Sequence, residues 1–370
     1  MEKALNFLVL IFTLNIVSCS SDGGDLPSPV QVSNAEERNG ETAPTGGDNG
    51  GNSVGTLVGG NVCVGDYSGV CMAMTRYTDS NGDVAYIPAQ FSVSDKDDEQ
   101  TVRTGLVVIA ADGSEYVWVS TVDTPLKMRD FGSYFSGGSL SNYYDETSLP
   151  AYQSMAKSVE TYGGFYVGRY EASYGSGSKL ADYVPASKPV TASQPGRIWV
   201  QFSPQDATVA CENLYRDNTS VQGFFLWGAN WDTTLQWLVN TGCKTYAEVA
   251  SNSTAWGNYS DDSFSPNARG NYTGVWEEAK ANNIYDLAGN NWEWTQERCG
   301  SNYVMRSGGY NLMGGACPGN RYPAAIRDPL PGNNHHPNVC FRAGLFLLPA
   351  EGTSDSTSGD DSTGIRPVTM

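Results

Sequence analysis

Short apolar runs separated by turn-forming residues dominate the middle of the chain and predict strands. Residues 105–111 and 116–119 are rich in valine, isoleucine and aromatic side chains, and Asp112-Gly113 lies between them. An Asp-Gly pair between two such runs predicts a β-hairpin. Residues 127–146 have no regular pattern. A Gly163-Gly164 break then precedes another apolar run, which predicts a strand ending near Glu171.

Helical spacing of apolar residues marks further segments. Residues 152–159 predict a first helix. Ser203 and Pro204 fit the N-cap and the first position of a second helix, and Asp206 adds an acid to its first turn. This helix is expected to run to Tyr215 and to bury Val209, Leu214 and Cys211.

A third helix is predicted near residues 230–240, where Trp231, Leu235 and Leu238 recur at helical spacing and should face the core. Residues 241–283 read mostly as loop. Short strands are then predicted around residue 292, at 304–306 and at 339–347.

The strand around residue 292 places an acid between two large aromatic side chains. Trp292 and Trp294 fall on one face of an extended segment, and Glu293 falls on the other. A carboxylate held among aromatics is costly unless it is paired or ligates a metal. The segment therefore predicts a core strand that helps to build a site.

Both ends of the chain differ in character from the middle. A charged start, an apolar run at 5–17 and a small residue before Cys19 make a secretory signal at residues 1–19 that resembles a bacterial lipoprotein signal. Cys19 would then carry the lipid and become the first residue of the mature chain. Residues 20–61 are polar and glycine-rich and predict a flexible tether, and residues 350–370 predict a disordered acidic tail. One folded domain is expected at residues 62–349.

Composition narrows the class of partner. With 22 basic against 40 acidic residues, the formal charge is -18. Nucleic acid is an unsuitable partner, because no basic patch is present to neutralise phosphates. The 42 glycines, 21 tyrosines and 9 tryptophans favour a loop-rich fold with an aromatic core over a helical bundle.

The chain has 8 cysteines, and lipid attachment at Cys19 would leave an odd number. Cys63 and Cys71 bracket a turn-rich segment and are expected to close a hairpin through a disulfide. The remaining cysteines cannot be paired from the sequence. The absence of a Cys-x-x-Cys unit gives no support to a zinc or iron–sulfur site.

Six segments in order resemble the formylglycine-generating enzyme (sulfatase-modifying factor) family: GFYVGRYE (164–171), SPQDATVAC (203–211), WGNY (256–259), IYDLAGNNWEW (284–294), RSGG (306–309) and CFRAG (340–344). The resemblance spans residues 86–348. It implies an α+β fold of the C-type-lectin-like kind, with short antiparallel sheets, a few helices and much loop.

The resemblance also implies a structural calcium ion at the tryptophan motif. Its ligands would be the Asp286 side chain, the Gly289 and Asn291 carbonyls and the Glu293 carboxylate. Carboxylate and main-chain oxygens are the ligands that calcium prefers. The alternative is that Asp286 and Glu293 only accept hydrogen bonds from nearby backbone amides.

The catalytic residues of the family are incomplete. Formylglycine-generating oxidases use a cysteine pair and copper after the Gly-Gly motif, whereas only Cys317 is present in that segment here, so copper is not expected. Related iron-dependent oxidases need several histidines, and this chain has 2, His335 and His336. Enzymatic activity is therefore not favoured, and Cys317 would be catalytic only if that activity were present.

A segment rich in Tyr, Arg, Asn and Gly follows the RSGG motif. Tyrosine and arginine give large rigid contacts while asparagine and glycine adapt their hydrogen bonds, a composition typical of ligand-binding surfaces. The segment resembles the variable region of proteins diversified by retroelements, although it lacks a Trp after Gly-Gly. The expected ligand contacts are Tyr310, Asn311, Asn320, Arg321, Tyr322, Arg327, Asp328, Asn333, Asn334, His335 and His336.

The favoured hypothesis is a lipid-anchored module, exposed at the surface of a bacterial cell envelope, that binds a protein or glycan ligand through this segment. The alternatives are an oxidase or another enzyme of the same fold, a structural envelope lipoprotein, and an inert loop rich in turn formers.

Overall fold

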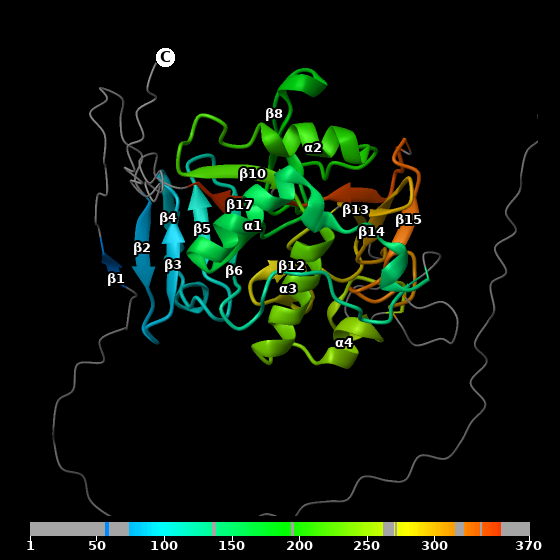
Figure 1. Ribbon diagram of the computed structural model, residues 1–370, viewed down its shortest axis with the longest axis horizontal. Helices are drawn as coiled ribbons and strands as arrows, with labels where there is room; N and C mark the ends of the chain where they lie inside the picture. Colours follow the sequence, from blue (N-terminus) through cyan, green and yellow to red (C-terminus); the bar gives the residue numbers. More distant parts are fainter. Residues whose placement is uncertain are drawn as a thin grey trace, which may run out of the picture. The chain divides into compact units, whose positions relative to one another are not determined.

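The computed structural model describes residues 74–134, 138–193, 196–261, 270, 272–314, 322–333 and 335–348, together with the backbone of β1 (Thr56–Val58). Within these residues, short sheets and a few helices make an α+β fold, as the sequence predicts. Figure 1 shows the helices lying against the sheets. The predicted disulfide between Cys63 and Cys71, the lipidation site Cys19 and the two chain ends lie outside the described residues.

The largest sheet has six antiparallel strands in the order β10-β17-β7-β6-β5-β4. In chain order these strands are β4 (Phe91–Val93), β5 (Val107–Ala110), β6 (Glu115–Ser120), β7 (Gly164–Gly168), β10 (Val221–Phe225) and β17 (Ala343–Leu347). The predicted hairpin is confirmed, because β5 and β6 pair on either side of Asp112-Gly113. Gly113 has φ 81°, a left-handed conformation that glycine adopts without strain.

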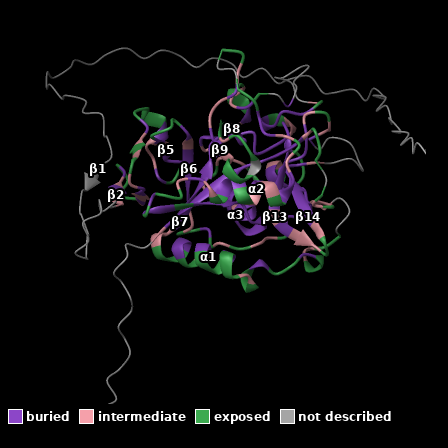
Figure 2. Ribbon diagram, turned by 90° about the horizontal axis from the view of Figure 1, so that it is seen from above, coloured by how far each residue is buried: buried purple, intermediate pink, exposed green. Residues whose placement is uncertain are grey.

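Both faces of this sheet are buried, because its side chains alternate between two apolar clusters. Val117 and Val119 of β6 pack in one cluster, with residues of α1 (Pro150–Tyr162) and α3 (Gly228–Asn240). Tyr116 and Trp118 pack in the other, with residues of α2 (Pro204–Glu212). In Figure 2 the central strands are buried, whereas α1 has an exposed outer face.

A four-stranded sheet stands in the order β15-β14-β13-β16. Its strands are β13 (Trp292–Cys299), β14 (Asn302–Arg306), β15 (Asp328–Leu330) and β16 (Val339–Phe341). β13 pairs antiparallel with β14 and parallel with β16. The strands predicted around residue 292, at 304–306 and at 339–347 are therefore confirmed, the last of them divided into β16 and β17.

Smaller elements complete the described fold. A three-stranded sheet joins β1 to β2 and β3, and two pairs of strands form separate ribbons. The strands are β2 (Thr75–Thr78), β3 (Val84–Ile87), β8 (Ser173–Ser176), β9 (Val184–Ala186), β11 (Lys280–Ala281) and β12 (Ile284–Tyr285). The helix α4 (Tyr246–Ala250) lies in the stretch predicted mostly as loop, where Thr245 and Glu248 form a capping box.

The capping box predicted for α2 is confirmed, since Ser203 and Asp206 cap each other's backbone amides. The helix ends at Glu212 rather than at Tyr215, which has φ 51°, outside the helical region. The prediction for Val209 is wrong: its side chain is 41% exposed. The buried face of α2 includes Ala207, Ala210 and Cys211, and Val209 lies on the other side. Leu214 is buried as predicted, just beyond the end of the helix.

Candidate functional site

The four-stranded sheet separates a polar interior from a cleft. Trp292 pairs with Val339, and Met305 pairs with both Trp294 and Asp328, so these side chains share one face. Glu293 pairs with Arg306 on β14 and with Cys340 on β16, so these three share the opposite face, where all are fully buried. The predicted alternation of Trp292, Glu293 and Trp294 is confirmed.

On the first face the sheet forms the floor of a cleft of about 360 Å³. The Trp292 and Tyr322 rings meet edge to face, with centroids 5.7 Å apart. Tyr322 and His336 were predicted as ligand contacts and are brought together here, with Asp328 from the same segment. The residues that line the cleft are Trp292, Met305, Leu312, Tyr322, Asp328, Leu330, His336 and Val339.

The other predicted contacts have different positions. Asn311, Asn333 and His335 are exposed, and Tyr310 is half-buried with its backbone N–H donated to the Asn290 carbonyl. The His335 ring nitrogen Nδ1 lies 2.9 Å from the carbonyl oxygen of Gln201. Asn320, Arg321, Asn334 and Cys317 lie outside the described residues.

Arg327 is not at the surface, which corrects its prediction as a ligand contact. Its side chain is fully buried, and its guanidinium pairs with Asp232 and Glu297. Tyr134 and Tyr143 lie beside the guanidinium, with ring centroids 5.5 and 5.6 Å from Cζ. Arg327 directly precedes Asp328, the first residue of β15. The two side chains therefore point to opposite faces of the sheet, Arg327 into the interior and Asp328 into the cleft.

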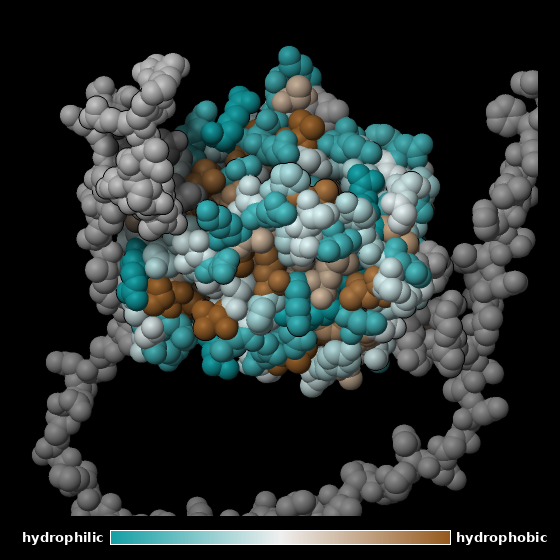
Figure 3. All heavy atoms as spheres, in the orientation of Figure 1, coloured by the Kyte–Doolittle hydropathy of each residue, from teal (hydrophilic) through white to brown (hydrophobic). Residues whose placement is uncertain are grey.

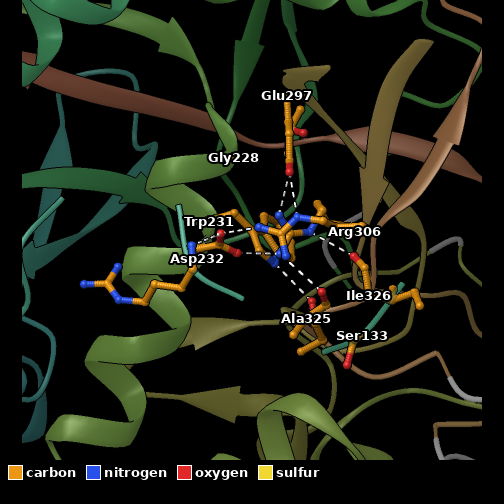
Figure 4. Close-up of polar contacts among 12 residues, drawn as sticks. Ser133, Gly228, Trp231, Asp232, Glu297, Arg306, Ala325 and Ile326 are labelled. Carbon is orange, nitrogen blue, oxygen red and sulfur yellow. Dashed lines mark hydrogen bonds and ion pairs between the residues drawn. The ribbon is translucent and has the colours of Figure 1, made fainter. Parts of the chain in front are cut away.

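Arg306 completes this buried ion-pair cluster. Its Nη1 lies 2.7 Å from Glu297 Oε2, and its Nη2 lies 2.7 Å from Asp232 Oδ1. Figure 4 shows the guanidinium between the two carboxylates, with further hydrogen bonds to the Ala325 and Ile326 carbonyls. Burial by itself would lower the pKa of Arg327, but Asp232 and Glu297 raise it well above its ordinary value. The RSGG motif contains Arg306 but does not predict its ion-pair partners.

A third carboxyl group lies close to the cluster. Both oxygens of Glu146 accept hydrogen bonds, at 2.8 and 3.0 Å, from the first backbone amides of α3, those of Gly228 and Ala229. Burial, and then the charge of Glu297, raise the pKa of Glu146 to about 8. Glu146 therefore caps a buried helix end in its protonated form at neutral pH.

The acid between the tryptophans has a cationic partner. Arg342 Nη2 lies 2.7 Å from Glu293 Oε1, and Arg342 Nε lies 3.1 Å from Oε2. The Glu171 carboxylate, also fully buried, accepts from the Asn291 amide at 3.0 Å and from the Asn290 and Asn291 side chains. The pairing that the sequence required for Glu293 is thus supplied by an arginine in the CFRAG segment.

The residues expected to bind calcium carry the negative charge that a cation needs, but several of their oxygen atoms already accept hydrogen bonds within the protein. Both oxygens of Glu293 accept from Arg342, and the Gly289 carbonyl accepts from the Ser307 hydroxyl at 2.9 Å. Asp286 accepts from Thr273 and Gly274 through Oδ2, whereas its buried Oδ1 has no hydrogen-bond partner. Burial is the main cause that raises the pKa of both Asp286 and Glu293.

A cysteine adjoins these acids. Ligand atoms of Glu171, Glu293 and Cys340 lie within 4.8 Å of one another, all buried. Cys211, Cys243, Cys299 and Cys340 are free thiols.

Among the residues that the structure describes, no helix is long and apolar enough to cross a membrane.

Comparisons with known proteins give only distant similarities. No protein-family model matches the chain, and no curated protein matches it at a significant level. The structure titled "Crystal Structure of CarF" aligns with 50% of this chain and 87% of its own at 14% identity and a TM-score of 0.32. "Treponema denticola variable protein 1" aligns with 75% of this chain and 95% of its own at 14% identity and a TM-score of 0.26. Both TM-scores are too low to assign a fold or a function.

Proposed function

We propose that this chain is a ligand-binding module and that its ligand enters the cleft on the four-stranded sheet. The observation that supports this most directly is the meeting of Trp292, Tyr322 and His336 around one concave surface. Aromatic side chains bind with little loss of conformational entropy, and concave sites with a few polar groups are typical of ligand pockets.

The fold that we propose is the C-type-lectin-like one of formylglycine-generating enzymes. The six ordered sequence segments support it, and several of them contribute to one connected arrangement. Glu293 of the tryptophan motif pairs with Arg342 of CFRAG, and Glu171 of the first segment accepts from Asn291 of the tryptophan motif. Segments far apart in the chain therefore meet through buried polar contacts.

The rigidity of the sheet behind the cleft supports the binding function. Its floor residues alternate with Glu293 and Arg306: the Glu293 carboxylate accepts two hydrogen bonds from Arg342, and the Arg306 guanidinium donates to Ile326, Glu297, Asp232 and Ala325. A binding surface built on strands with a fixed polar interior is already ordered before the ligand arrives, which reduces the entropy cost of binding.

Calcium is a second part of the proposal. Glu171, Asp286 and Glu293 are fully buried beside one arginine, Arg342, so ionised carboxylates would exceed the positive charge. A cation ligated by Asp286 Oδ1 and nearby carbonyls would offset that excess, in the structural role expected from the sequence.

The third part is the location. We propose attachment to a bacterial envelope through a lipid on Cys19, with the polar residues between Cys19 and β1 as the tether. This tether is shorter than the 20–61 expected from the sequence, because β1 at Thr56–Val58 pairs with β2. The acidic excess of the chain suits a hydrated, exposed surface. On the face seen in Figure 3, hydrophobic side chains form separate patches among hydrophilic ones.

The test is binding of the purified mature chain to printed arrays of glycans and of extracellular proteins. Tyr322→Ala should lower the specific signals roughly tenfold or more, the loss expected for a central aromatic contact. Tyr144→Ala is the matched control, because Tyr144 is 50% exposed and does not line the cleft. The proposal fails if no spot binds, or if both variants retain every signal.

A further inference from the structure

A second, smaller pocket lies at the end of α3 and shares no described lining residue with the cleft on the four-stranded sheet. Its walls come from the start of β3, the loop before β5, the end of β6 with the residues that follow it, and the last turn of α3. The pocket has a volume of about 80 Å³. Pockets for drug-sized ligands begin at roughly 300 Å³, so this one suits a ligand of a few heavy atoms.

The pocket contains a buried hydrogen-bond donor that the fold leaves unused. Trp237 lines the pocket, and its side chain is 2% exposed within the apolar cluster of α1 and α3. Its indole Nε1 has no hydrogen-bond partner among the described residues. A buried donor without a partner is destabilising, and nearly all such groups in native proteins find one. A ligand with an acceptor oxygen would supply the missing partner.

The walls of the pocket are held in place by side chains that bridge its segments. The buried Asp79 carboxylate accepts from the backbone amide of Asp83 at 3.0 Å and from that of Val102 at 2.9 Å. At the end of α3, the Asn240 side-chain amide donates to the carbonyl of Asp123 at 3.0 Å. The pocket is therefore ordered before a ligand arrives, which reduces the entropy cost of binding.

Charged groups of both signs line the pocket. Arg103 contributes a guanidinium, and Asp83 and Asp123 contribute carboxylates. These three side chains are exposed, and none forms an ion pair or a side-chain hydrogen bond with another described residue. The C-terminal end of α3 adds partial negative charge on the side of the carboxylates, which favours a cationic group there.

We propose that this pocket binds a free α-amino acid with a small aliphatic side chain, as a site additional to the cleft. The ligand carboxylate would accept from Trp237 Nε1 and from the Arg103 guanidinium. The ligand ammonium would donate to the carboxylates of Asp83 and Asp123. The valines of the lining would contact its side chain: Val84, Val102 and Val122.

Ligands with one charged end match only part of this pocket. A simple amine would pair with the carboxylates but would bring no acceptor to the Trp237 indole. A simple carboxylate would satisfy the indole and Arg103, but it would be repelled by Asp83 and Asp123. A zwitterion satisfies the donor and both signs of charge together.

Alanine and its two halves test this directly. Propionate lacks the ammonium of alanine, and ethylamine lacks its carboxylate. Binding to the purified mature chain is measured by calorimetry and by NMR titration of 15N-labelled tryptophan. We expect alanine to bind at least about tenfold more tightly than either fragment, because each fragment loses charge-assisted hydrogen bonds. The indole signal of Trp237, identified by its loss in Trp237→Phe, should shift when alanine is added.

Two variants separate the contacts. Arg103→Gln should weaken alanine binding about tenfold without weakening ethylamine binding, whereas Asp123→Asn should weaken both and leave propionate binding no weaker. Arg216→Gln is the matched control, because Arg216 is exposed and does not line the pocket. Folding of each variant is checked by its melting temperature.

Three results would overturn the inference: alanine that binds no more tightly than propionate or ethylamine, a Trp237 signal that does not move, or an unchanged affinity for alanine in Arg103→Gln. Tyr322→Ala should retain alanine binding, because Tyr322 lines the cleft and not this pocket. Loss of alanine binding in that variant would place the amino acid in the cleft and contradict a separate site.

Discussion

The buried position of Arg327 can be tested by replacing it with methionine, which keeps the length of the side chain and removes its charge. In the wild-type protein Arg327 Nε lies 2.6 Å from Glu297 Oε1, and its Nη2 pairs with Asp232. All of these side chains are 0% exposed. The substitution leaves the Asp232 and Glu297 carboxylates with Arg306 as the one remaining cation that is paired with them in the described residues.

The magnitude follows from the cost of an unpaired buried charge. Removing one partner of a buried ion pair typically costs about 3–5 kcal/mol, because the other charge remains desolvated without compensation. That is a large part of the roughly 5–15 kcal/mol by which domains are stable. For a domain of this size, each kcal/mol lowers the melting temperature by about 2–4 °C, so a fall of roughly 6–20 °C is expected.

The assay is urea unfolding followed by tryptophan fluorescence, with a thermal melt as a second measure. Lys179→Met is the control, because the Lys179–Asp182 pair is 3.7 Å long with side chains 72% and 51% exposed. Exposed pairs of this kind contribute at most about 1 kcal/mol. A loss below about 1 kcal/mol in Arg327→Met would refute the reasoning. A variant that keeps its stability but loses ligand binding would restore Arg327 as a contact residue.

Three further predictions concern stability. The pKa of Glu146 is raised from 4.5 to about 8, so between these pH values the folded state holds a proton that the unfolded state has lost. The free energy of unfolding therefore falls as pH rises, by about 1.4 kcal/mol per pH unit. Urea unfolding at pH 5.5 and 7.5 should show a smaller fall in Glu146→Gln than in the wild type. Removing calcium with a chelator should lower the melting temperature of the wild type but not of Asp286→Asn, and equal melting of the wild type with and without calcium would exclude the proposed ion. Ser203→Ala removes the side-chain cap of α2 and should cost about 1 kcal/mol in urea unfolding, whereas Ser193→Ala, outside any helix, should cost close to nothing.

The elements that the sequence predicts well are those whose determinants are local. The β5–β6 hairpin depends on Asp112-Gly113, and α2 depends on Ser203, Pro204 and Asp206, all within a few residues of the structure that they specify. The helical face of α3 was found for the same reason, because Trp231, Leu235 and Leu238 are all buried. The short helix α4, which was not predicted, has a local signal of the same kind in the Thr245 and Glu248 capping box.

The buried charges could not be predicted because their partners are distant in the chain. Arg306 pairs with Asp232, 74 residues away, and Arg342 pairs with Glu293, 49 residues away. Spacing along the sequence contains no information on such pairs until the strand order is known. The sequence did show that Glu293 needed a partner, because it alternates with two tryptophans, but it could not distinguish an arginine from a metal ion.

The same limit explains why the ligand-binding segment was predicted only in part. Its composition marks residues 310–336 as a surface of Tyr, Arg and Asn, yet Arg327 is fully buried and the next residue, Asp328, lines the cleft. Composition treats neighbours alike, whereas a strand sends them to opposite faces. Pairing of Met305 with Asp328 places the acid on the same face as Trp292, and the arginine before it lies among the interior carboxylates. In a segment of this kind, strand register therefore decides which residues meet a ligand and which stabilise the sheet beneath it.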